Sequence, residues 1–460
     1  MIDIIQELRN AVGQDIVLTG EDVRERHYHI WHMGEGLSAK AVVLPKTTEQ
    51  VAAICKICQM HKQEVIVFGG LTNLVGSTET KGHEVIISME RMNSIEEVDP
   101  ISRTMTVQSG VILENIQLAA KENELLFPLN FGAKGSAQIG GCISTNAGGL
   151  RVLRFGMTRA LILGLEVVLM DGTIINSLKK IVKDNSAYDL KQMFIGSEGT
   201  LGVVTKAVLK LIEAPKSRNS AFLAFDDYEK VVSFLKFIDK EMAGALSGFE
   251  VIWQKSYEVM TAPTAHNKPP IPHGYKYYVL VESLGSDQEK DREKLQSIVE
   301  QVILSDQAKD AVMAFTESDL DWFWKIREDV KVLAEQARYD QHFDVSAPIN
   351  ALGSYVDSVE EKINALDEVV GAYPFGHLAD GNIHFIVAKN NKEEALKNQI
   401  NDLVYNPLTE LGGSVSAEHG IGLHKKRYLA LCRSVEEIAL MKRLKNSFDP
   451  EGLLNPGKVL

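Results

Sequence analysis

Apolar positions in the first 215 residues fall into short β-branched runs separated by longer stretches with a helical period. Runs of about four to eight apolar residues predict strands, and apolar residues recurring every three or four positions predict helices. The expected helices cover residues 2–12, 48–62 and 113–122. The expected strands are AVVLP, VIVF, EVIISM, TMTVQ, LILGLEVVLM, TIIN and VVTKAVLKL, with Asp171-Gly172 as the turn between VVLM and TIIN.

The pattern changes after Pro215 to two consecutive strand-helix-strand units. The first is AFLAF, a helix over 228–242 and LSGFEVI; the second is YKYYVLVES, a helix over 287–304 and AVMAFT. This order predicts a second domain with an antiparallel sheet and helices on one face. A helix over 322–338, the strand HFDVSAP and a helix over 356–370 are expected to follow.

Three glycine-rich segments lie in the first part of the chain, near 69–76, 132–149 and 196–202. The richest stretch, Pro128 to Gly156, has few apolar side chains, so we expect a loop rather than a core helix or strand. Glycines let a ligand approach the backbone closely, and freed N–H groups can hold phosphate oxygens. None of the three segments has the strand, G-x-G-x-x-G, helix order of a Rossmann domain, which argues against that fold.

A pair of histidines flanks a predicted hairpin turn in YPFGHLADGNIHFIV. If Asp380-Gly381 forms a two-residue turn, Ala379 pairs with Asn382 and His377 faces His384, with Cβ atoms about 4.5–5.5 Å apart. Glu418 in SAEHGIG is a candidate third ligand, and two His plus one Glu leave an open position, as catalytic zinc sites do. The neighbouring His419 would then be free to act as a base. Histidines that merely satisfy buried polar neighbours remain the alternative.

Composition and charge narrow the class of protein further. Apolar residues make up 45% and charged residues 24%, which is ordinary for a globular protein, and the net charge of −13 argues against broad nucleic-acid or anionic-membrane binding. Four cysteines form no dense framework, and the acidic amphipathic N-terminus resembles neither a secretory signal nor a basic transit peptide, so we expect a cytoplasmic protein. No apolar run is long enough to predict a transmembrane helix.

Six motifs in order carry a family resemblance: GAKGSAQIGGCISTNAGGLRVLRFG, LGLEVVLMDGT, FIGSEGTLGVVT, GHLADGNIH, SAEHGIG and LNPGK. Together they resemble the flavin-dependent D-2-hydroxyacid dehydrogenases of the vanillyl-alcohol-oxidase type, in the D-2-hydroxyglutarate and D-lactate dehydrogenase branch. The resemblance implies an α+β fold with a two-part FAD-binding domain (1–215), an α+β substrate or cap domain with an antiparallel sheet and the metal-site hairpin (216–412), and a C-terminal segment (413–460) that packs back on the FAD domain.

The resemblance also implies which residues line FAD. These are Gly69, Gly70, Thr72, Asn73, Pro128, Gly135, Ser136, Gly140, Gly141, Ser144, Asn146, Gly149, Gly202, Val203 and Asn455. Between His61 and His266 the only histidine is His83, which lies outside the glycine-rich segments, so a histidyl-flavin bond is not expected and FAD is expected to be non-covalent.

By resemblance, His377, His384 and Glu418 are the metal ligands, with zinc first and manganese, cobalt or iron as alternatives, and His419 is the base. The metal would bind the substrate hydroxyl and carboxylate, and the Cα hydride would pass to flavin N5. Candidate substrate-binding residues are Arg327, Lys331, His342 and Asn382. Lys331 and His342 stand where the 2-hydroxyglutarate branch usually has threonine and lysine.

Because of that departure, the substrate stays open among D-2-hydroxyglutarate, D-lactate and D-malate types. Electron-transfer flavoprotein or a quinone is the expected electron acceptor. The sequence does not determine the oligomeric state, and a homodimer is one of the alternatives. Two other functions remain as alternatives: a subunit of a glycolate-oxidase-type complex, and a metal-dependent hydrolase.

Overall fold

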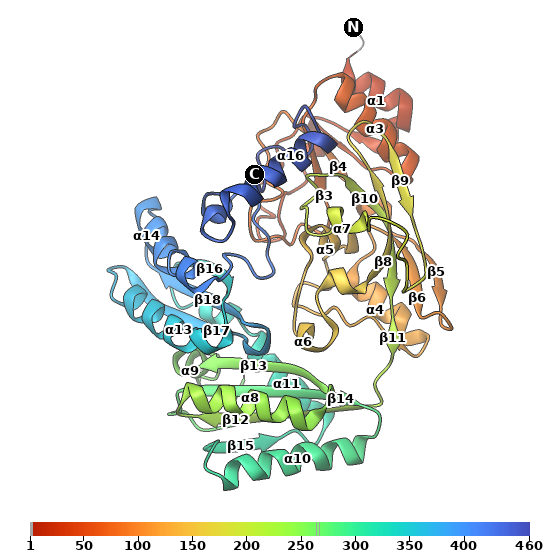
Figure 1. The fold of residues 1–460 in the computed structure, drawn as a ribbon. Coiled ribbons are helices and arrows are strands. Elements are labelled where there is room, and N and C mark those ends of the chain that lie inside the picture. The colour runs from red at the N-terminus through yellow and green to blue at the C-terminus, as the bar shows by residue number, and fades with distance from the viewer. Residues whose placement is uncertain (1–2, 264, 266) are drawn as a thin grey trace. The chain divides into compact units, whose positions relative to one another are not determined.

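The structure is a computed structural model that describes residues 3–263, 265 and 267–460. The chain divides into two compact units. Unit 1 contains residues 1–149, 156–214 and 418–460, and unit 2 contains residues 150–155 and 215–417 (Figure 1). The first residue of the helix predicted over 2–12 lies outside the described residues. Across the described ranges, no helix has both the length and the apolar character that a membrane crossing requires.

Unit 1 is built on three sheets with helices packed against them. A four-stranded sheet has the order β1-β2-β4-β3, a five-stranded antiparallel sheet has the order β5-β6-β10-β8-β9, and β7 pairs with β11. The strands are β1 (Val17–Leu18), β2 (Ala41–Val43), β3 (Val65–Phe68), β4 (Val85–Ser88), β5 (Ile95–Asp99), β6 (Thr104–Gln108), β7 (Leu125–Leu126), β8 (Ile162–Val168), β9 (Ile174–Ser177), β10 (Val203–Lys210) and β11 (Ile212–Glu213). The α-helices are α1 (Ile4–Val12), α2 (Glu21–Arg24), α3 (Thr48–Met60), α4 (Leu113–Glu122), α5 (Ile139–Thr145), α7 (Lys191–Phe194) and α16 (Val435–Phe448).

Helix α3 shows why the predicted helices form. The Thr47 side chain caps its N-terminus by accepting from the Gln50 N–H, and its apolar face is fully buried. Cys55 and Cys58 belong to that face as free thiols, and burial raises the pKa of Cys58 to about 12. They therefore act as small core side chains, not as a metal or redox pair.

Unit 2 is organised by one seven-stranded sheet in the order β15-β12-β14-β13-β17-β18-β16, with antiparallel pairing throughout. The strands are β12 (Ser217–Phe225), β13 (Leu246–Trp253), β14 (Tyr277–Gly285), β15 (Asp310–Met313), β16 (Tyr339–Ser346), β17 (Val369–His377) and β18 (Asn382–Lys389). The helices are α6 (Val152–Phe155), α8 (Tyr228–Met242), α9 (Gln254–Met260), α10 (Gln288–Leu304), α11 (Glu317–Glu328), α12 (Lys331–Ala334), α13 (Ile349–Asn364), α14 (Glu394–Tyr405) and α15 (Leu408–Leu411).

Helices cover both faces of this sheet, so the prediction of helices on one face is wrong. Phe225 on β12 packs on Phe234 of α8, with ring centroids 5.5 Å apart. Phe222 lies three residues earlier on the same strand and packs on Phe323 of α11 and on Tyr257 of α9. Because side chains alternate along a strand, Phe222 and Phe225 point to opposite faces. Helices on both faces explain why nearly every residue of β12, β13 and β14 is buried.

Two other predicted helices have different bounds. The helix expected over 322–338 is split, because α11 ends at Glu328 and the short helix α12 begins at Lys331. The helix expected over 356–370 begins earlier, at Ile349, and ends at Asn364, and residues from Val369 onward form β17. In both cases apolar residues keep the helical spacing beyond the end of the helix, so this spacing alone does not mark where the helix ends.

Replacing Phe222 by alanine is expected to destabilise unit 2 by about 3–5 kcal/mol, because a fully buried ring between two helices leaves a cavity. The free energy of unfolding in urea measures this. Leu304→Ala is the control, since that side chain is 88% exposed and its loss should change stability by about 0.5 kcal/mol or less. Equal effects of the two substitutions would contradict the assigned packing.

Candidate active site

Two rows of side chains cross the unit 2 sheet and carry most of the predicted chemistry. In the first row Glu250 pairs with His377, and His377 pairs with Asn382. In the second row Phe375 pairs with His384, and His384 pairs with Asp344. Directly paired residues share a face, and His377 lies two residues after Phe375, so both rows lie on the same face of the sheet.

The hairpin that joins β17 and β18 differs from the predicted two-residue turn. Residues Leu378–Asp380 form a 3₁₀ turn, Gly381 takes a left-handed conformation with φ of 80°, and His377 pairs with Asn382 instead of facing His384. The predicted register is therefore wrong. The two histidines still share a face because the shift is an even number of residues, and their ring centroids are 5.4 Å apart.

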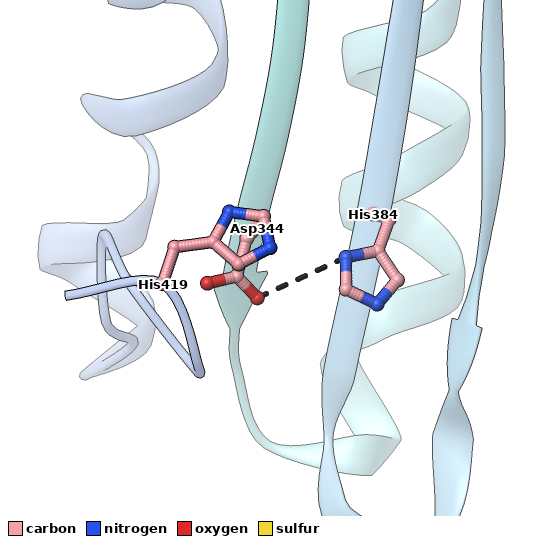
Figure 2. Close-up of side chains that lie close together, drawn as sticks. All are labelled: Asp344, His384 and His419. Atoms are coloured by element: carbon pink, nitrogen blue, oxygen red, sulfur yellow. Dashed lines mark ion pairs between the residues drawn. The ribbon is translucent and has the colours of Figure 1, made fainter. Parts of the chain in front are cut away.

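The ligand atoms of His377, His384 and Glu418 all lie within 4.8 Å of one another. A second such group contains Asp344, His384 and His419. Figure 2 shows His419 on a loop, with its imidazole near the Asp344 carboxylate of β16 and the His384 ring of β18. The three predicted ligands thus form one of these groups, and the predicted base belongs to the other.

Asp344 was not among the site residues predicted from the sequence. It is fully buried and accepts hydrogen bonds from the Asn382 side chain (2.9 Å) and from the Ala417 backbone N–H (3.1 Å). Its carboxylate also lies 3.8 Å from His384 Nδ1. The bond to Ala417 fixes the backbone immediately before Glu418. An aspartate inside the apolar strand HFDVSAP was the signal that could have identified it, because buried charges require partners.

Glu250 was also missed, although it stands in the apolar strand LSGFEVIW and is 1% exposed. Arg327 Nε donates to Glu250 Oε2 at 2.7 Å, and His377 Nδ1 lies 2.7 Å from Glu250 Oε1. Burial alone would raise the pKa of the Glu250 carboxyl, but the charges of His377 and Arg327 outweigh it and lower the pKa below its usual value. Arg327 is itself buried, and its guanidinium lies 4.7 Å from the centroid of the Phe375 ring.

The remaining predicted substrate residues have different surroundings. Asn382 is buried beside His377, and among the described residues its Oδ1 has no hydrogen-bond partner. His342 lies on β16, two residues before Asp344, and its Nε2 pairs with Asp340. The Lys331 side chain is 82% exposed and lies 3.2 Å from Glu335, so the structure does not group it with Arg327.

The three glycine-rich segments meet in unit 1. A Cβ atom at Gly70 would collide with the Ser136 carbonyl oxygen, so the first two segments touch through their backbones. The second segment meets the third where the Glu198 N–H donates to the Ser144 carbonyl at 2.7 Å. Asn455 Nδ2 donates to the Glu198 carbonyl, and Asn455 Oδ1 accepts from the Val67 N–H. The contact between the first two segments requires glycine at position 70.

Pro128 to Gly156 contains helices α5 and α6, so the prediction that it holds no helix is wrong. The apolar side chains Ile139, Cys142 and Ile143 are spaced for a helix and are buried, although glycines lie between them. Gly140 packs against Ser109 so closely that a Cβ atom there would lie 2.7 Å from the serine Cβ. This close packing compensates for the low helix propensity of glycine.

The other predicted FAD residues lie in the same unit. Asn146 has a left-handed conformation at the end of α5, with φ of 51°. A Cβ at Gly149 would collide with the Asn130 carbonyl, and Gly202 and Val203 are packed against β8. Gly135 and Ser136 are exposed, Pro128 is buried, and the rest are partly buried: Gly69, Thr72, Asn73, Gly140, Gly141 and Ser144.

Within unit 1, the Glu418 side chain packs against the glycine-rich stretch. A Cβ atom at Gly148 would lie 2.5 Å from Glu418 Oε1 and 3.1 Å from its Cγ and Cδ. The side chain of one predicted metal ligand therefore rests on backbone that only glycine can provide.

Comparison with known proteins assigns the chain to a family. Residues 39–177 match the FAD binding domain, and residues 214–459 match the C-terminal domain of FAD linked oxidases. The chain is 39% identical to a putative mitochondrial D-lactate dehydrogenase of Schizosaccharomyces pombe, over 90% of this chain and 81% of that protein. It is 36% identical to the mitochondrial D-2-hydroxyglutarate dehydrogenase of Danio rerio, over 92% of this chain and 79% of that protein.

The expected cytoplasmic location is contradicted by these relatives, because both are named as mitochondrial proteins. Scarce, unpaired cysteines argue against an oxidising compartment, but they do not distinguish one reducing compartment from another. The composition argument was therefore too coarse to assign the location.

Solved structures give the same fold at low sequence identity. An alkyldihydroxyacetonephosphate synthase matches with a TM-score of 0.76 at 17% identity, over 99% of this chain and 87% of that chain. A p-cresol methylhydroxylase matches with a TM-score of 0.75 at 18% identity, over 99% of this chain and 96% of that chain. The fold is thus the predicted α+β fold of vanillyl-alcohol-oxidase-type flavoproteins. The chain belongs to the FAD-linked oxidase family, in the branch that contains the D-2-hydroxyglutarate and D-lactate dehydrogenases, and is an FAD-dependent oxidoreductase.

Proposed function

We propose that this enzyme oxidises a D-2-hydroxyacid to its 2-oxoacid with the help of a divalent metal held by His377, His384 and Glu418. The observation that carries the proposal is the cluster of these three ligand atoms within 4.8 Å, with His419 following Glu418 in the chain. The substrate class is supported by the names of the relatives, which act on D-lactate or D-2-hydroxyglutarate.

The donor set fits a catalytic metal. Two imidazole nitrogens and one carboxylate oxygen leave a coordination position for a substrate, and zinc accepts this combination. A bound metal would polarise the substrate oxygens and lower the pKa of the hydroxyl group. The buried Asn382 Oδ1, which lacks a partner among the described residues, supports a further polar contact to a ligand at this position.

His419 is the proposed base, because it follows a ligand in the chain and lies near Asp344, which can orient its ring. It takes the hydroxyl proton as the Cα–H bond breaks. A bound FAD would supply the acceptor for the hydride that leaves Cα. Arg327 is proposed to hold the substrate carboxylate through the part of its guanidinium that Glu250 does not engage.

D-2-hydroxyglutarate has a second carboxylate at its far end, and binding it would require a second cationic side chain in the site. Nothing in the surroundings of Lys331 supports it as a second carboxylate anchor, because its side chain is exposed and beside Glu335. We therefore propose a D-lactate-like or short 2-hydroxyacid substrate ahead of D-2-hydroxyglutarate.

The electron acceptor is a separate question. A relative from Saccharomyces cerevisiae at 35% identity is named a D-2-hydroxyglutarate–pyruvate transhydrogenase. A 2-oxoacid is therefore a candidate electron acceptor beside electron-transfer flavoprotein and quinones.

A panel of D- and L-2-hydroxyacids tests the proposed reaction, with anaerobic bleaching of the flavin as the measurement. We expect bleaching by D-acids, loss of bleaching after treatment with a chelator, and recovery with Zn²⁺ or Mn²⁺. Bleaching that chelation leaves unchanged would remove the metal from the reaction, and bleaching by L-acids alone would reject the stereochemistry.

His419→Asn is expected to slow flavin bleaching by about 100- to 10,000-fold, because general-base catalysis typically contributes that much. FAD content and metal content should stay near those of the unaltered enzyme. The matched control is His424→Asn, since His424 lies in the same segment but is exposed and paired with Glu79. Equal rates for the two variants would reject His419 as the base.

Gly148→Ala is expected to lower metal affinity by about 10- to 100-fold, since the added methyl group displaces the Glu418 carboxylate. Metal content after dialysis against a metal buffer measures the effect, and the flavin absorbance verifies that FAD remains. Gly132→Ala is the control in the same stretch, because a Cβ atom there meets nothing within 4 Å. Unchanged metal content in the Gly148 variant would argue against Glu418 as a ligand.

A further inference from the structure

Glu250 is a buried carboxylate that joins two parts of the candidate site. It lies on β13, a strand in which every residue is buried. A charged side chain at such a position is costly unless it is paired and hydrogen-bonded. Each of its two oxygens contacts a different site residue, His377 on one side and Arg327 on the other.

The sheet register explains why Glu250 reaches His377. The two residues form a direct pair between β13 and β17, so their side chains leave the same face. Helix α11 covers that face and presents Arg327, whose Nε lies 2.7 Å from Glu250 Oε2. Phe375 lies under the guanidinium and limits its movement.

The contact to Glu250 determines which nitrogen of His377 faces a metal. An ionised carboxylate accepts a hydrogen bond, so His377 carries its proton on Nδ1, and the unprotonated Nε2 is the nitrogen that can coordinate a metal. Carboxylates that accept from the second nitrogen of a ligating histidine fix both its tautomer and the plane of its ring. The same carboxylate fixes the guanidinium of Arg327 through Nε, which leaves Nη1 and Nη2 outside that ion pair.

We propose that Glu250 is a positioning residue that couples metal binding at His377 to substrate binding at Arg327. This inference rests on the proposed function, because it takes His377 as a metal ligand and Arg327 as the carboxylate anchor. Glu250 itself touches neither metal nor substrate. It aligns the two groups that do, so that the hydroxyl end and the carboxylate of one acid are bound in a fixed relation.

A second buried glutamate in the same sheet supplies a matched control. Glu282 on β14 is also 1% exposed, and it is paired with Arg151 (3.1 Å) and Arg218 (2.6 Å) and bonded to Ser247. It contacts no predicted metal ligand. Substituting either glutamate by glutamine therefore removes a buried negative charge beside arginine, and only one substitution alters the surroundings of His377.

The test compares Glu250→Gln with Glu282→Gln in the full-length FAD-loaded protein. Zn²⁺ affinity is measured by competition with a chromophoric chelator, and KM for the best D-2-hydroxyacid is measured at saturating Zn²⁺. A glutamine can accept from only one of the two donors, so we expect Glu250→Gln to weaken Zn²⁺ binding about 10- to 100-fold and to raise KM. Glu282→Gln should leave Zn²⁺ affinity unchanged.

The outcomes separate this inference from the proposed function. If the unaltered protein binds neither Zn²⁺ nor Mn²⁺, the proposed function itself fails. If it binds Zn²⁺ and Glu250→Gln binds it equally well, or loses no more affinity than Glu282→Gln, the positioning role is rejected. Should Glu250→Gln fail to fold, Glu250→Asp keeps the charge but withdraws it by one methylene group. That variant should also lose Zn²⁺ affinity, and an affinity equal to that of the unaltered protein would reject the role.

Discussion

The antiparallel register of β13, β17, β18 and β16 is the constraint on which the candidate active site depends. It places Glu250, His377 and Asn382 in one row and Phe375, His384 and Asp344 in the next. A shift by one residue in any of these strands would turn its side chains to the other face. The surrounding apolar packing on both faces therefore has a chemical role, because it prevents the strands from slipping.

Buried carboxylates connect that sheet to the residues with proposed roles in the reaction. Glu250 holds His377 and Arg327, and Asp344 holds Asn382 and the backbone before Glu418. Within unit 1, Glu198 accepts from the backbone N–H groups of Ile421 and Gly422, just after His419. Within each unit, a buried carboxylate thus holds the backbone next to the proposed ligand and base, Asp344 before them and Glu198 after them.

Much of this arrangement could be predicted from the sequence, and the features that could not be predicted have physical explanations. Local patterns gave helices such as α4 and α8 with the observed bounds, and ordered motifs gave the family and FAD. The hairpin register was missed because Leu378–Asp380 form a 3₁₀ turn, which the Asp-Gly pair does not reveal. Glu250 and Asp344 were missed because their partners are distant in sequence, and a single charge in an apolar strand does not identify them. The roles of His377, His384, Glu418 and His419 stay predictions.

The division of the chain between the two units affects how the protein can be made. Residues 150–155 belong to unit 2 although both flanks belong to unit 1, and Arg151 in that segment pairs with Glu282. Unit 1 in turn needs residues 418–460, since the Val65 N–H donates to the Leu453 carbonyl. Neither unit is therefore complete within a continuous piece of the chain. During synthesis the N-terminal part of unit 1 must wait for unit 2 to emerge from the ribosome before its own folding can finish.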